Sequence, residues 1–454
     1  MVFFSSNISV FRYVLILSPF LFLAPATITA AEITSLRESV SYAVAHNRTL
    51  AVSVTHVDRA QAEVDMATGQ IMPSVDVSTG FVRTNSPLGS FGAKLQQKRI
   101  TAADFSPASL NQPGYINNYQ SRVGVNMPLY SGGAMWAGRA RAMHRAEASE
   151  LEFEFHKQQV IYQTIAAYVH SRQAAAQVKA SENAVKAAKK RLQDAEAMKK
   201  RGMAIDSDVM DAHVHVLRSQ VRMDEARNMY AQSLESLRLI LGMDSSAELN
   251  PLSEPNLRFS PEPVARMLEK QSDRRADLLA LEGELEASES ARNQSRSGYL
   301  PHVNLMAAQE WNSETPNLNN SNAMVGVVVN MNLFSGGEDS AKVRAATSDR
   351  VALEFQLQDK RHQIRNEISQ AYRNVQMAEQ RFQSESEASK QTSESLRIKS
   401  LRHAQGLETT SDLLDAQVRA DASKMEYIRA RYSLVTAKAA LLLTTGMLDE
   451  EAVQ

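Results

Sequence analysis

Four stretches of the chain alternate apolar and polar residues with a period of two. They cover about residues 71–83, 119–130, 299–311 and 323–334. The last stretch is the most regular, with Val325, Val327 and Val329 in one apolar row. A period of two is typical of β-strands with one face in an apolar environment. Each stretch has about ten residues, the length of a tilted membrane-spanning strand, although a half-buried sheet in a soluble sandwich would show the same alternation.

Two much longer segments have the pattern of helices. Gly133 and Gly202 are separated by 68 residues without proline, and Gly337 and Gly406 by 68 residues without proline or glycine. At 1.5 Å per residue, each continuous helix would be ~100 Å long. Apolar residues recur at heptad-like spacing, which predicts helices packed side by side. They are Leu151, Phe155, Tyr162, Ile165, Val169, Tyr230, Leu234, Leu237, Leu241, Ile428, Tyr432, Val435, Ala439 and Leu442.

The same octapeptide pattern occurs twice. "NMPLYSGG" at 126–133 and "NMNLFSGG" at 330–337 share six of eight letters, and they lie 204 residues apart. The same offset aligns Tyr168 with Tyr372 and Gly202 with Gly406. Each octapeptide is predicted to be the last part of a strand that runs into a long helix. Glycine tolerates the backbone turn that such a junction needs, and the predicted junction residues are Gly132, Gly133, Gly336 and Gly337.

Further upstream the spacing between the two halves changes. "IMPSVDV" at 71–77 resembles "YLPHVNL" at 299–305, but the offset is now 228. The first half therefore contains 24 additional residues, and we expect residues 84–118 to form a long extracellular loop opposite the short polar loop at 312–322. The predicted organisation is a first unit at 32–250, a linker at 251–265, a second unit at 266–447 and a tail at 448–454.

The first residues have the pattern of an export signal. Arg12 precedes the apolar run "YVLILSPFLFLAPA", which ends in small residues before Glu32. We predict a signal peptide at 1–31; a retained membrane anchor is the alternative. Beyond it, no stretch approaches the ~20 apolar residues of a membrane helix. The mature protein is therefore expected to be exported, and either soluble or held in a membrane by its strands.

Composition and charge narrow the function further. The 454-residue chain has a net charge of −1, which gives no electrostatic basis for nucleic-acid binding. It has no cysteine, so disulfides, thiolate zinc sites and cysteine nucleophiles are excluded. His213 and His215 are two apart on a predicted helix and face different sides. No phosphate-binding glycine loop or Gly-x-Ser-x-Gly elbow occurs, so we predict no catalytic, cofactor or metal site.

Taken together, the motifs carry a family resemblance. Strands that begin Pro-x-Val, strand ends of the form Leu-Tyr/Phe-Ser-Gly-Gly, and Gly-x5-Asp-x-x-Asp-Ala turns each occur twice, in the same order. From about Leu36 to Met447 the chain resembles the TolC-like outer-membrane efflux proteins. The resemblance implies an α+β membrane protein in which three chains share a twelve-stranded β-barrel, four strands from each, continuous with a long periplasmic α-helical barrel. One departure is Asn47-Arg48 and Arg275-Ala276-Asp277, where the family often has proline.

The resemblance also implies a function. It points to the outer-membrane exit duct of a tripartite efflux pump or type I secretion system, extending into the periplasm. Its partners would be two further copies in a homotrimer, a periplasmic adaptor, an inner-membrane transporter and outer-membrane lipid. The sequence leaves two alternatives: a soluble periplasmic coiled-coil adaptor or scaffold, and a secreted enzyme. The nature of the cargo is open.

The remaining candidate chemistry is a carboxylate pair after each helix reversal. Asp412 and Asp415 share a helix face, as do Asp208 and Asp211. Acidic residues in a first helical turn are also favoured by the helix dipole, and Thr409-x-x-Asp412 resembles a capping box. By resemblance, Asp412 and Asp415 match the aspartates of a periplasmic gate, and we assign Asp208 and Asp211 to the same constriction. The hairpin tips that would contact the adaptor contain Gly202, Gly406, Ser207 and Ser411. Glu408 stands where the family often has a basic residue.

Overall fold

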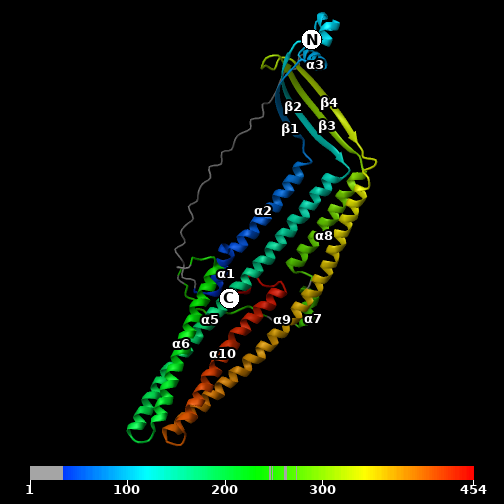
Figure 1. Ribbon diagram of the computed structural model, residues 1–454. Coiled ribbons are helices and arrows are strands. Elements are labelled where there is room, and N and C mark those ends of the chain that lie inside the picture. Colours follow the sequence, from blue (N-terminus) through cyan, green and yellow to red (C-terminus); the bar gives the residue numbers. More distant parts are fainter. Residues whose placement is uncertain (1–33, 245–246, 248, 260–262, 272, 454) are drawn as a thin grey trace, which may run out of the picture.

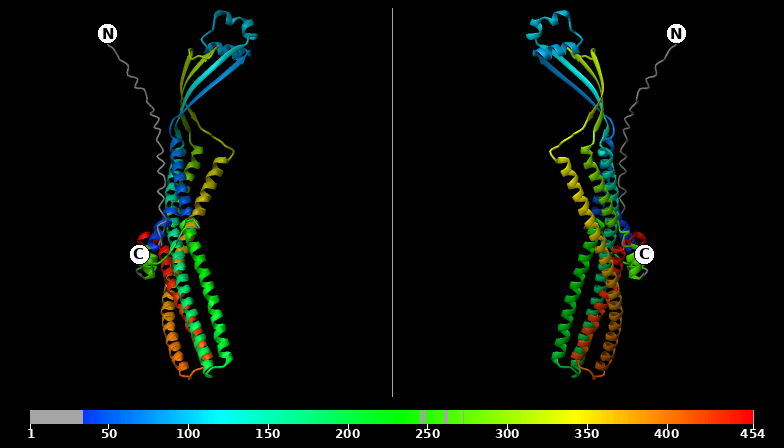
Figure 2. Two further views of the ribbon diagram at one scale, coloured as in Figure 1. Left: turned by 90° about the vertical axis from the view of Figure 1, so that its left-hand side faces the viewer. Right: turned by 90° about the vertical axis from the view of Figure 1, so that its right-hand side faces the viewer.

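The protein is an elongated molecule with a β-sheet at one end and the tips of two helical hairpins at the other (Figures 1 and 2). The computed structural model describes residues 34–453, apart from 245–246, 248, 260–262 and 272. The predicted signal peptide at 1–31 lies outside these residues. Among the helices of the described part, none combines the length and the apolarity that a membrane span requires.

Four antiparallel strands form one sheet in the order β1-β2-β3-β4. They are β1 (Ser74–Thr84), β2 (Ile116–Ser131), β3 (His302–Ser313) and β4 (Ser321–Asn330). The four strands predicted from the alternation are present. The register of β2 on β3 shifts between Pro128 and Tyr130. Proline cannot donate a ladder hydrogen bond, and it is tolerated in strands at such irregular positions.

The second octapeptide differs from the prediction. In the first half β2 continues to Ser131, because His302 of β3 is still its partner. In the second half β4 ends at Asn330, four residues short of the predicted end, and residues 331–337 have no regular structure. Asn330 already pairs with His302, the first residue of β3, so nothing remains for later residues to pair with. The backbone beyond Asn330 therefore leaves the sheet, and Leu333 and Phe334 are each 86% exposed.

The long helices form two hairpins that run away from the sheet. The first half contains α1 (Leu36–His46), α2 (Arg48–Gly69), α5 (Ala134–Lys200) and α6 (Asp206–Leu241). The second contains α7 (Val264–Gln271), α8 (Ala276–Ser295), α9 (Glu338–Ala404) and α10 (Thr410–Thr444). Both α5 and α9 have 67 residues, so each is ~100 Å long. The short elements are α3 (Pro87–Gln96), η1 (Ala102–Phe105), α4 (Pro107–Asn111), η2 (Arg296–Tyr299) and η3 (Glu450–Ala452).

Two helices begin at positions where the family often has proline and this chain has another residue. The side chain of Asn47 caps α2 by accepting hydrogen bonds from the backbone N–H groups of Thr49 and Leu50, at 2.9 and 3.1 Å. The guanidinium of Arg275, immediately before α8, pairs with Asp277 at 2.7 Å and with Glu367 at 2.5 Å. Side-chain capping and ion pairing thus take the place of proline at the two helix starts.

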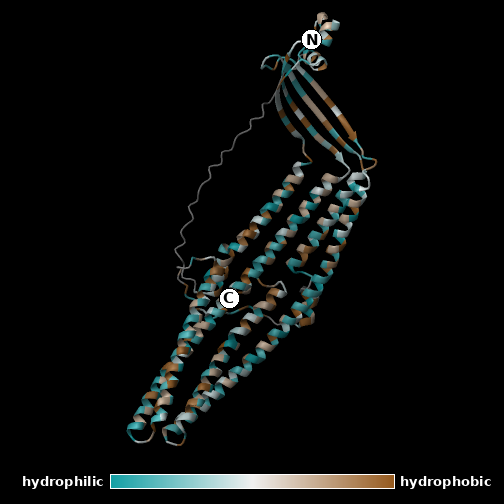
Figure 3. Ribbon diagram, in the orientation of Figure 1, coloured by the Kyte–Doolittle hydropathy of each residue, from teal (hydrophilic) through white to brown (hydrophobic). Residues whose placement is uncertain are grey.

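The hydrophobic core lies midway along the molecule, where α1, α5, α6 and α10 meet. Its largest side chains are Tyr168 and Tyr432. Tyr168 is fully buried, and its hydroxyl lies 3.0 Å from the backbone oxygens of both Thr34 and Ser253. A second cluster, with Leu278, Ile364 and Leu441, joins α8, α9 and α10. Toward the tips, hydrophilic and hydrophobic residues are interspersed along the helices (Figure 3). The packing that holds the two hairpins together is therefore concentrated at mid-length.

Candidate channel wall and periplasmic gate

The two faces of the sheet differ in chemistry. On one face, Val75, Val125, Ala307 and Val325 stand opposite one another across all four strands. On the other face the equivalent row is Ser78, Arg122, Glu310 and Asn322. The apolar face is not covered by other parts of the chain: Val77 is 77% exposed and Val325 is 75% exposed. Such a face suits lipid, whereas the opposite face, with its charges and amides, suits a water-filled lumen.

Aromatic residues flank the apolar face at both of its ends. At the end far from the helices, Phe81 packs on Tyr119 with a centroid separation of 4.7 Å, and Trp311 lies on the same face. At the end near the helices stand Tyr130, Trp136, Tyr299 and Phe334, all substantially exposed. From Val303 to Trp311 the strand is about 27 Å long at 3.4 Å per residue, and its nine residues suit a tilted membrane-spanning strand. The sequence analysis missed these two belts, although the residues that form them are visible in it.

The two hairpin tips have the same backbone geometry. Gly202 and Gly406 adopt left-handed conformations with φ of +73° and +74°. The N–H of Met203 donates to the carbonyl of Met198 at 2.9 Å, and that of Leu407 to Arg402 at 2.9 Å. This is the pattern by which glycine closes a helix C-terminus. The prediction that the chain reverses at these glycines is confirmed. Ser207 and Ser411, in the first turns of α6 and α10, are exposed.

Asp412 is held at the start of α10. The hydroxyl of Thr409 accepts a hydrogen bond from the Asp412 N–H at 3.1 Å and donates one to its Oδ2 atom at 2.5 Å. The hydrogen bond from the Thr409 hydroxyl lowers the pKa of Asp412 below its usual value of 3.8. Asp415, three residues on, is exposed on the same helix face. The structure therefore supports the capping interaction and also leaves both carboxylates free to face a lumen.

The first hairpin has a similar but less exposed arrangement. Asp208 accepts a hydrogen bond from the backbone N–H of Ile205 at 3.1 Å and is half-buried, whereas Asp211 is exposed. Within a single chain neither pair of aspartates forms a closed ring. What the structure places together is one acidic first turn at each of two adjacent hairpin tips.

Each tip is also braced by ion pairs within its own hairpin. In the second, Glu408 pairs with Lys399 at 3.0 Å and with Arg402 at 3.1 Å, both on α9. In the first, Lys199 pairs with Asp206 at 2.7 Å. The acidic residue at 408, in place of the family's basic one, thus finds its basic partners on the preceding helix.

A polar cluster between the hairpins escaped the sequence analysis. Above the tips, His215 of α6 is buried and Arg191 of α5 and Asp421 of α10 are half-buried. Each has a buried side-chain atom without a hydrogen-bond partner among the described residues. Burial raises the pKa of Asp421 and lowers those of His215 and Arg191. The amide of Gln417 donates to the Asp421 carboxylate at 2.7 Å. Only the packing of separate helices brings these residues together, so no local pattern could have revealed them.

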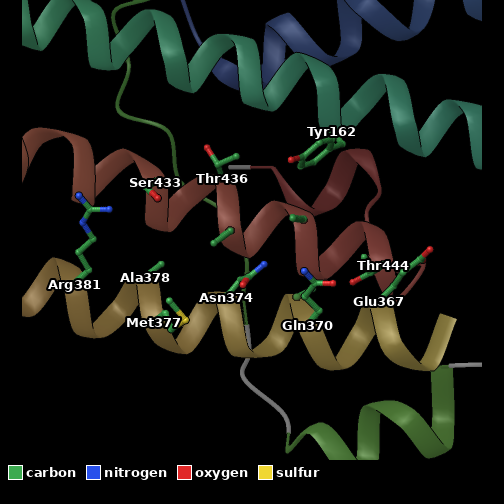
Figure 4. A pocket seen from close by; sticks show the side chains of 13 residues that line it. Tyr162, Glu367, Gln370, Asn374, Met377, Ala378, Arg381, Ser433, Thr436 and Thr444 are labelled. Carbon is green, nitrogen blue, oxygen red and sulfur yellow. The ribbon is translucent and has the colours of Figure 1, made fainter. Parts of the chain in front are cut away.

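A groove of about 620 Å³ runs between α9 and α10 and is closed on one side by Tyr162 of α5 (Figure 4). Its lining is mostly small or amide-bearing, with Asn374, Met377 and Ser433 among the side chains. No histidine lines it.

Across the described residues no group of three or more side chains is arranged to hold a metal ion. His213 is exposed and His215 is buried, so the two do not share a site.

Comparison with known proteins decides what this architecture is. The family model for outer membrane efflux proteins matches residues 40–243 and 267–447. The chain belongs to the outer membrane efflux protein family. It is 24% identical over 353 residues to the alkaline protease secretion protein AprF of Pseudomonas aeruginosa, covering 74% of this chain and 71% of AprF.

Solved structures show the same fold at low sequence identity. The outer membrane channel CmeC of Campylobacter jejuni is 16% identical, with a TM-score of 0.78, and the match covers 92% of this chain and 86% of CmeC. CusC is 14% identical, with a TM-score of 0.79, and the match covers 91% of this chain and 92% of CusC. The predicted fold class is confirmed: each chain contributes a four-stranded sheet continuous with long helices.

Membership of the family settles the broad function. The outer membrane efflux protein described here is an exit duct of an efflux or secretion system, located in the outer membrane and extending into the periplasm. Members of the family are trimeric channels that work with adaptors and inner-membrane transporters, not enzymes. The alternative of a soluble periplasmic scaffold is thereby set aside.

Proposed function

We propose that three copies of this chain form one duct, with a twelve-stranded barrel in the outer membrane and a periplasmic tunnel closed at the hairpin tips. The observation that carries the proposal is the pair of unpaired sheet edges: β1 and β4 each have a strand neighbour on one side only. Open edges are not tolerated in lipid, and four strands are too few to close a barrel. Pairing β4 of one copy with β1 of the next removes every edge. The division into two copies of one unit, at 32–250 and 266–447, is part of the same proposal.

Asp412 and Asp415 are proposed as the periplasmic constriction, with Asp208 and Asp211 beside them. Threefold symmetry would bring six carboxylates of the first pair around the axis. Rings of carboxylates concentrate cations and repel anions, so the closed duct should be cation-selective. The exposed tip residues Ser207 and Ser411, with Met203, Ile205 and Leu407 at 61–68% exposure, are proposed as the adaptor-docking surface. No cofactor or nucleic acid has a part in this function.

Native mass measurement of the detergent-purified protein tests the assembly. We expect a trimer that persists at low protein concentration, since removing sheet edges and covering α9 bury large surfaces. A monomer or a dimer would contradict the proposal.

The relation to AprF favours protein secretion as the transport task. AprF is a secretion protein for alkaline protease and is 24% identical to this chain, whereas CmeC and CusC share its fold at only 16% and 14% identity. Expression in Pseudomonas aeruginosa that lacks AprF, followed by measurement of protease in the medium, tests this. Restored secretion, absent with an empty vector, supports a secretion duct. Correctly assembled trimers that restore no secretion would count against it.

A further inference from the structure

The loop between β1 and β2 is 24 residues longer than the equivalent loop of the second half, and it folds into a compact element at the end of the sheet far from the helices (Figure 1). This insertion, residues 85–115, contains α3, η1 and α4. The predicted loop is therefore largely helical. It joins Thr84 to Ile116, which are already paired across β1 and β2. A two-residue turn would suffice to connect such a pair. The insertion is not needed to close the hairpin, so its structure calls for another explanation.

A chain of hydrogen bonds fixes the insertion to the polar face of the sheet. The Gln97 side chain is 1% exposed and donates to the backbone oxygen of Asn117 at 2.8 Å and to Asn118 Oδ1 at 2.9 Å. The Asn118 amide donates to Asn312 Oδ1 at 2.8 Å, and the Asn312 amide donates to Glu310 at 2.6 Å. Along β2, Asn118 shares its face with Arg122, and along β3, Asn312 shares its face with Glu310. Both belong to the face assigned to the lumen.

The insertion also has internal packing that keeps it in one shape. Lys94 pairs with Asp104 at 2.7 Å, and Thr101 donates to the same carboxylate from its N–H and its hydroxyl. These interactions lower the pKa of Asp104 to about 2. The rings of Phe91 and Phe105 meet edge to face at a centroid distance of 5.6 Å. A second link, from Arg99 to Glu314 at 2.5 Å, ties the insertion to the loop between β3 and β4.

Apolar side chains remain uncovered on this element. Leu88 is 85% exposed, Leu95 is 53% exposed and Phe105 is 61% exposed. On an insertion anchored to the lumen face, such residues lie over the mouth of the barrel. In a trimer the insertions of the two other copies are the nearest surfaces that could cover them.

We propose that the insertion narrows the extracellular outlet of the duct: three copies, each docked on the lumen face through Gln97, converge over the mouth and set the size of molecule that passes. This inference rests on the proposed trimeric duct. It assigns a size-selecting element at the outer end, separate from the constriction at the hairpin tips.

The absence of cysteine from the chain allows a direct test on intact cells. Ser78, on the lumen face of β1, is exposed and stands six residues inside Thr84, about 20 Å along the strand. In the variant Ser78→Cys, we expect a small maleimide added outside the cells to react, and a maleimide on a long polyethylene glycol chain to fail. When residues 85–115 are replaced by Asn-Gly, both reagents should react. A control, Leu318→Cys in the loop between β3 and β4, should react with both reagents in both backgrounds.

The outcomes separate the two proposals. Equal reaction of Ser78→Cys with the large reagent, whether residues 85–115 are present or replaced by Asn-Gly, would contradict the proposed outlet constriction. That result would leave the proposed duct unaffected. No reaction with either reagent even after the replacement, while Leu318→Cys reacts, would show that this face does not line an open lumen, and the duct proposal itself would fail.

If the protein with Asn-Gly in place of residues 85–115 does not assemble, a single substitution tests the same proposal. Gln97→Ala removes the anchoring side chain, and its matched control is Gln96→Ala, where the side chain is exposed. We expect Gln97→Ala to speed the reaction of Ser78→Cys with the large reagent roughly tenfold, equivalent to about 1.4 kcal/mol, and Gln96→Ala to leave it unchanged. Equal rates in the two variants would contradict the anchoring role of Gln97.

Discussion

The helices α5 and α9 have the same length and equivalent places in their halves, yet very different surroundings. Of 67 residues each, 15 are buried in α5 and six in α9. Helix α5 packs against α1, α2, α6, α8 and α10, whereas α9 packs against α8 and α10 and, less extensively, against α7 and η2. The aligned tyrosines show the difference: Tyr168 of α5 is fully buried, and Tyr372 of α9 is only partly buried. Similar sequence in two halves therefore does not give them similar environments.

The junction glycines differ in the same way. Gly132 and Gly336 have similar positive φ values, +62° and +64°. A Cβ atom at Gly132 would lie 2.6 Å from the backbone oxygen of Ser297, whereas one at Gly336 would meet nothing within 4 Å. The first junction is enclosed by its own chain and the second is open. Together with the sparse packing of α9, this makes the second half the less enclosed of the two within the chain.

Replacing the two tyrosines by alanine tests the comparison most strongly. Tyr168→Ala should lower the free energy of unfolding by ~3–5 kcal/mol, because it empties a fully buried site and leaves hydrogen-bonding groups unpaired. Tyr372→Ala should cost clearly less. Thermal unfolding in detergent, followed by circular dichroism, measures both. Equal losses would mean that another copy buries Tyr372 as completely as the chain itself buries Tyr168.

Alanine at the junction glycines gives a smaller effect. Both positions incur the left-handed penalty of ~1–2 kcal/mol for a residue with a Cβ. Gly132→Ala adds a clash with the Ser297 backbone, so its trimers should dissociate at lower temperature than those of Gly336→Ala. Heating samples before gel electrophoresis shows the order. If Gly336→Ala is the more harmful, the second junction is enclosed by a neighbouring chain.

Removing the charges of the proposed gate should change conduction far more than stability. In Asp412→Asn with Asp415→Asn the size of the side chains is kept, and exposed charges at a helix start contribute little to stability because water screens them. Single-channel recordings should show loss of cation preference and of block by multivalent cations. The matched pair Asp208→Asn with Asp211→Asn should have a weaker effect, since Asp208 is half-buried. Unchanged cation selectivity in the Asp412→Asn, Asp415→Asn variant would show that these aspartates stabilise the start of the helix and do not control conduction.

The smallest expected effect is a shift in pH dependence. Hydrogen bonding to Thr409 lowers the pKa of Asp412 below 3.8 in the folded chain. Its ionised form therefore contributes stability above pH 3.8, which is lost as the pH falls through the lower folded value. Thr409→Val removes the hydroxyl at nearly constant volume, so the cation preference should disappear at a higher pH than in the parent. Conductance ratios recorded across acidic pH check this. An unchanged midpoint would show that the neighbouring carboxylates, and not Thr409, set the titration.

Local patterns in the sequence determined much of this protein. A period of two, sustained over about ten residues, identified the four strands, because alternate side chains of a strand must face opposite environments. The glycines at 202 and 406 located the helix reversals, because only glycine readily adopts the left-handed conformation that closes a helix end. The doubled motifs also located the acidic first turn that follows each reversal.

Contacts between distant segments decided the rest. The sequence could not show that β4 stops at Asn330, because that depends on where β3 begins. Nor could it show that Gln97 is hydrogen-bonded to Asn118 and so fixes the insertion to the polar face of the sheet. The half-buried placement of Arg191 and Asp421 between the hairpins was equally out of its reach. Hydrogen bonding, burial and charge pairing of this kind depend on distances between residues far apart in the chain. The periodicity of the sequence determines which face of a helix or strand a residue occupies. Only the packing of the helices and strands determines which residues that face contacts.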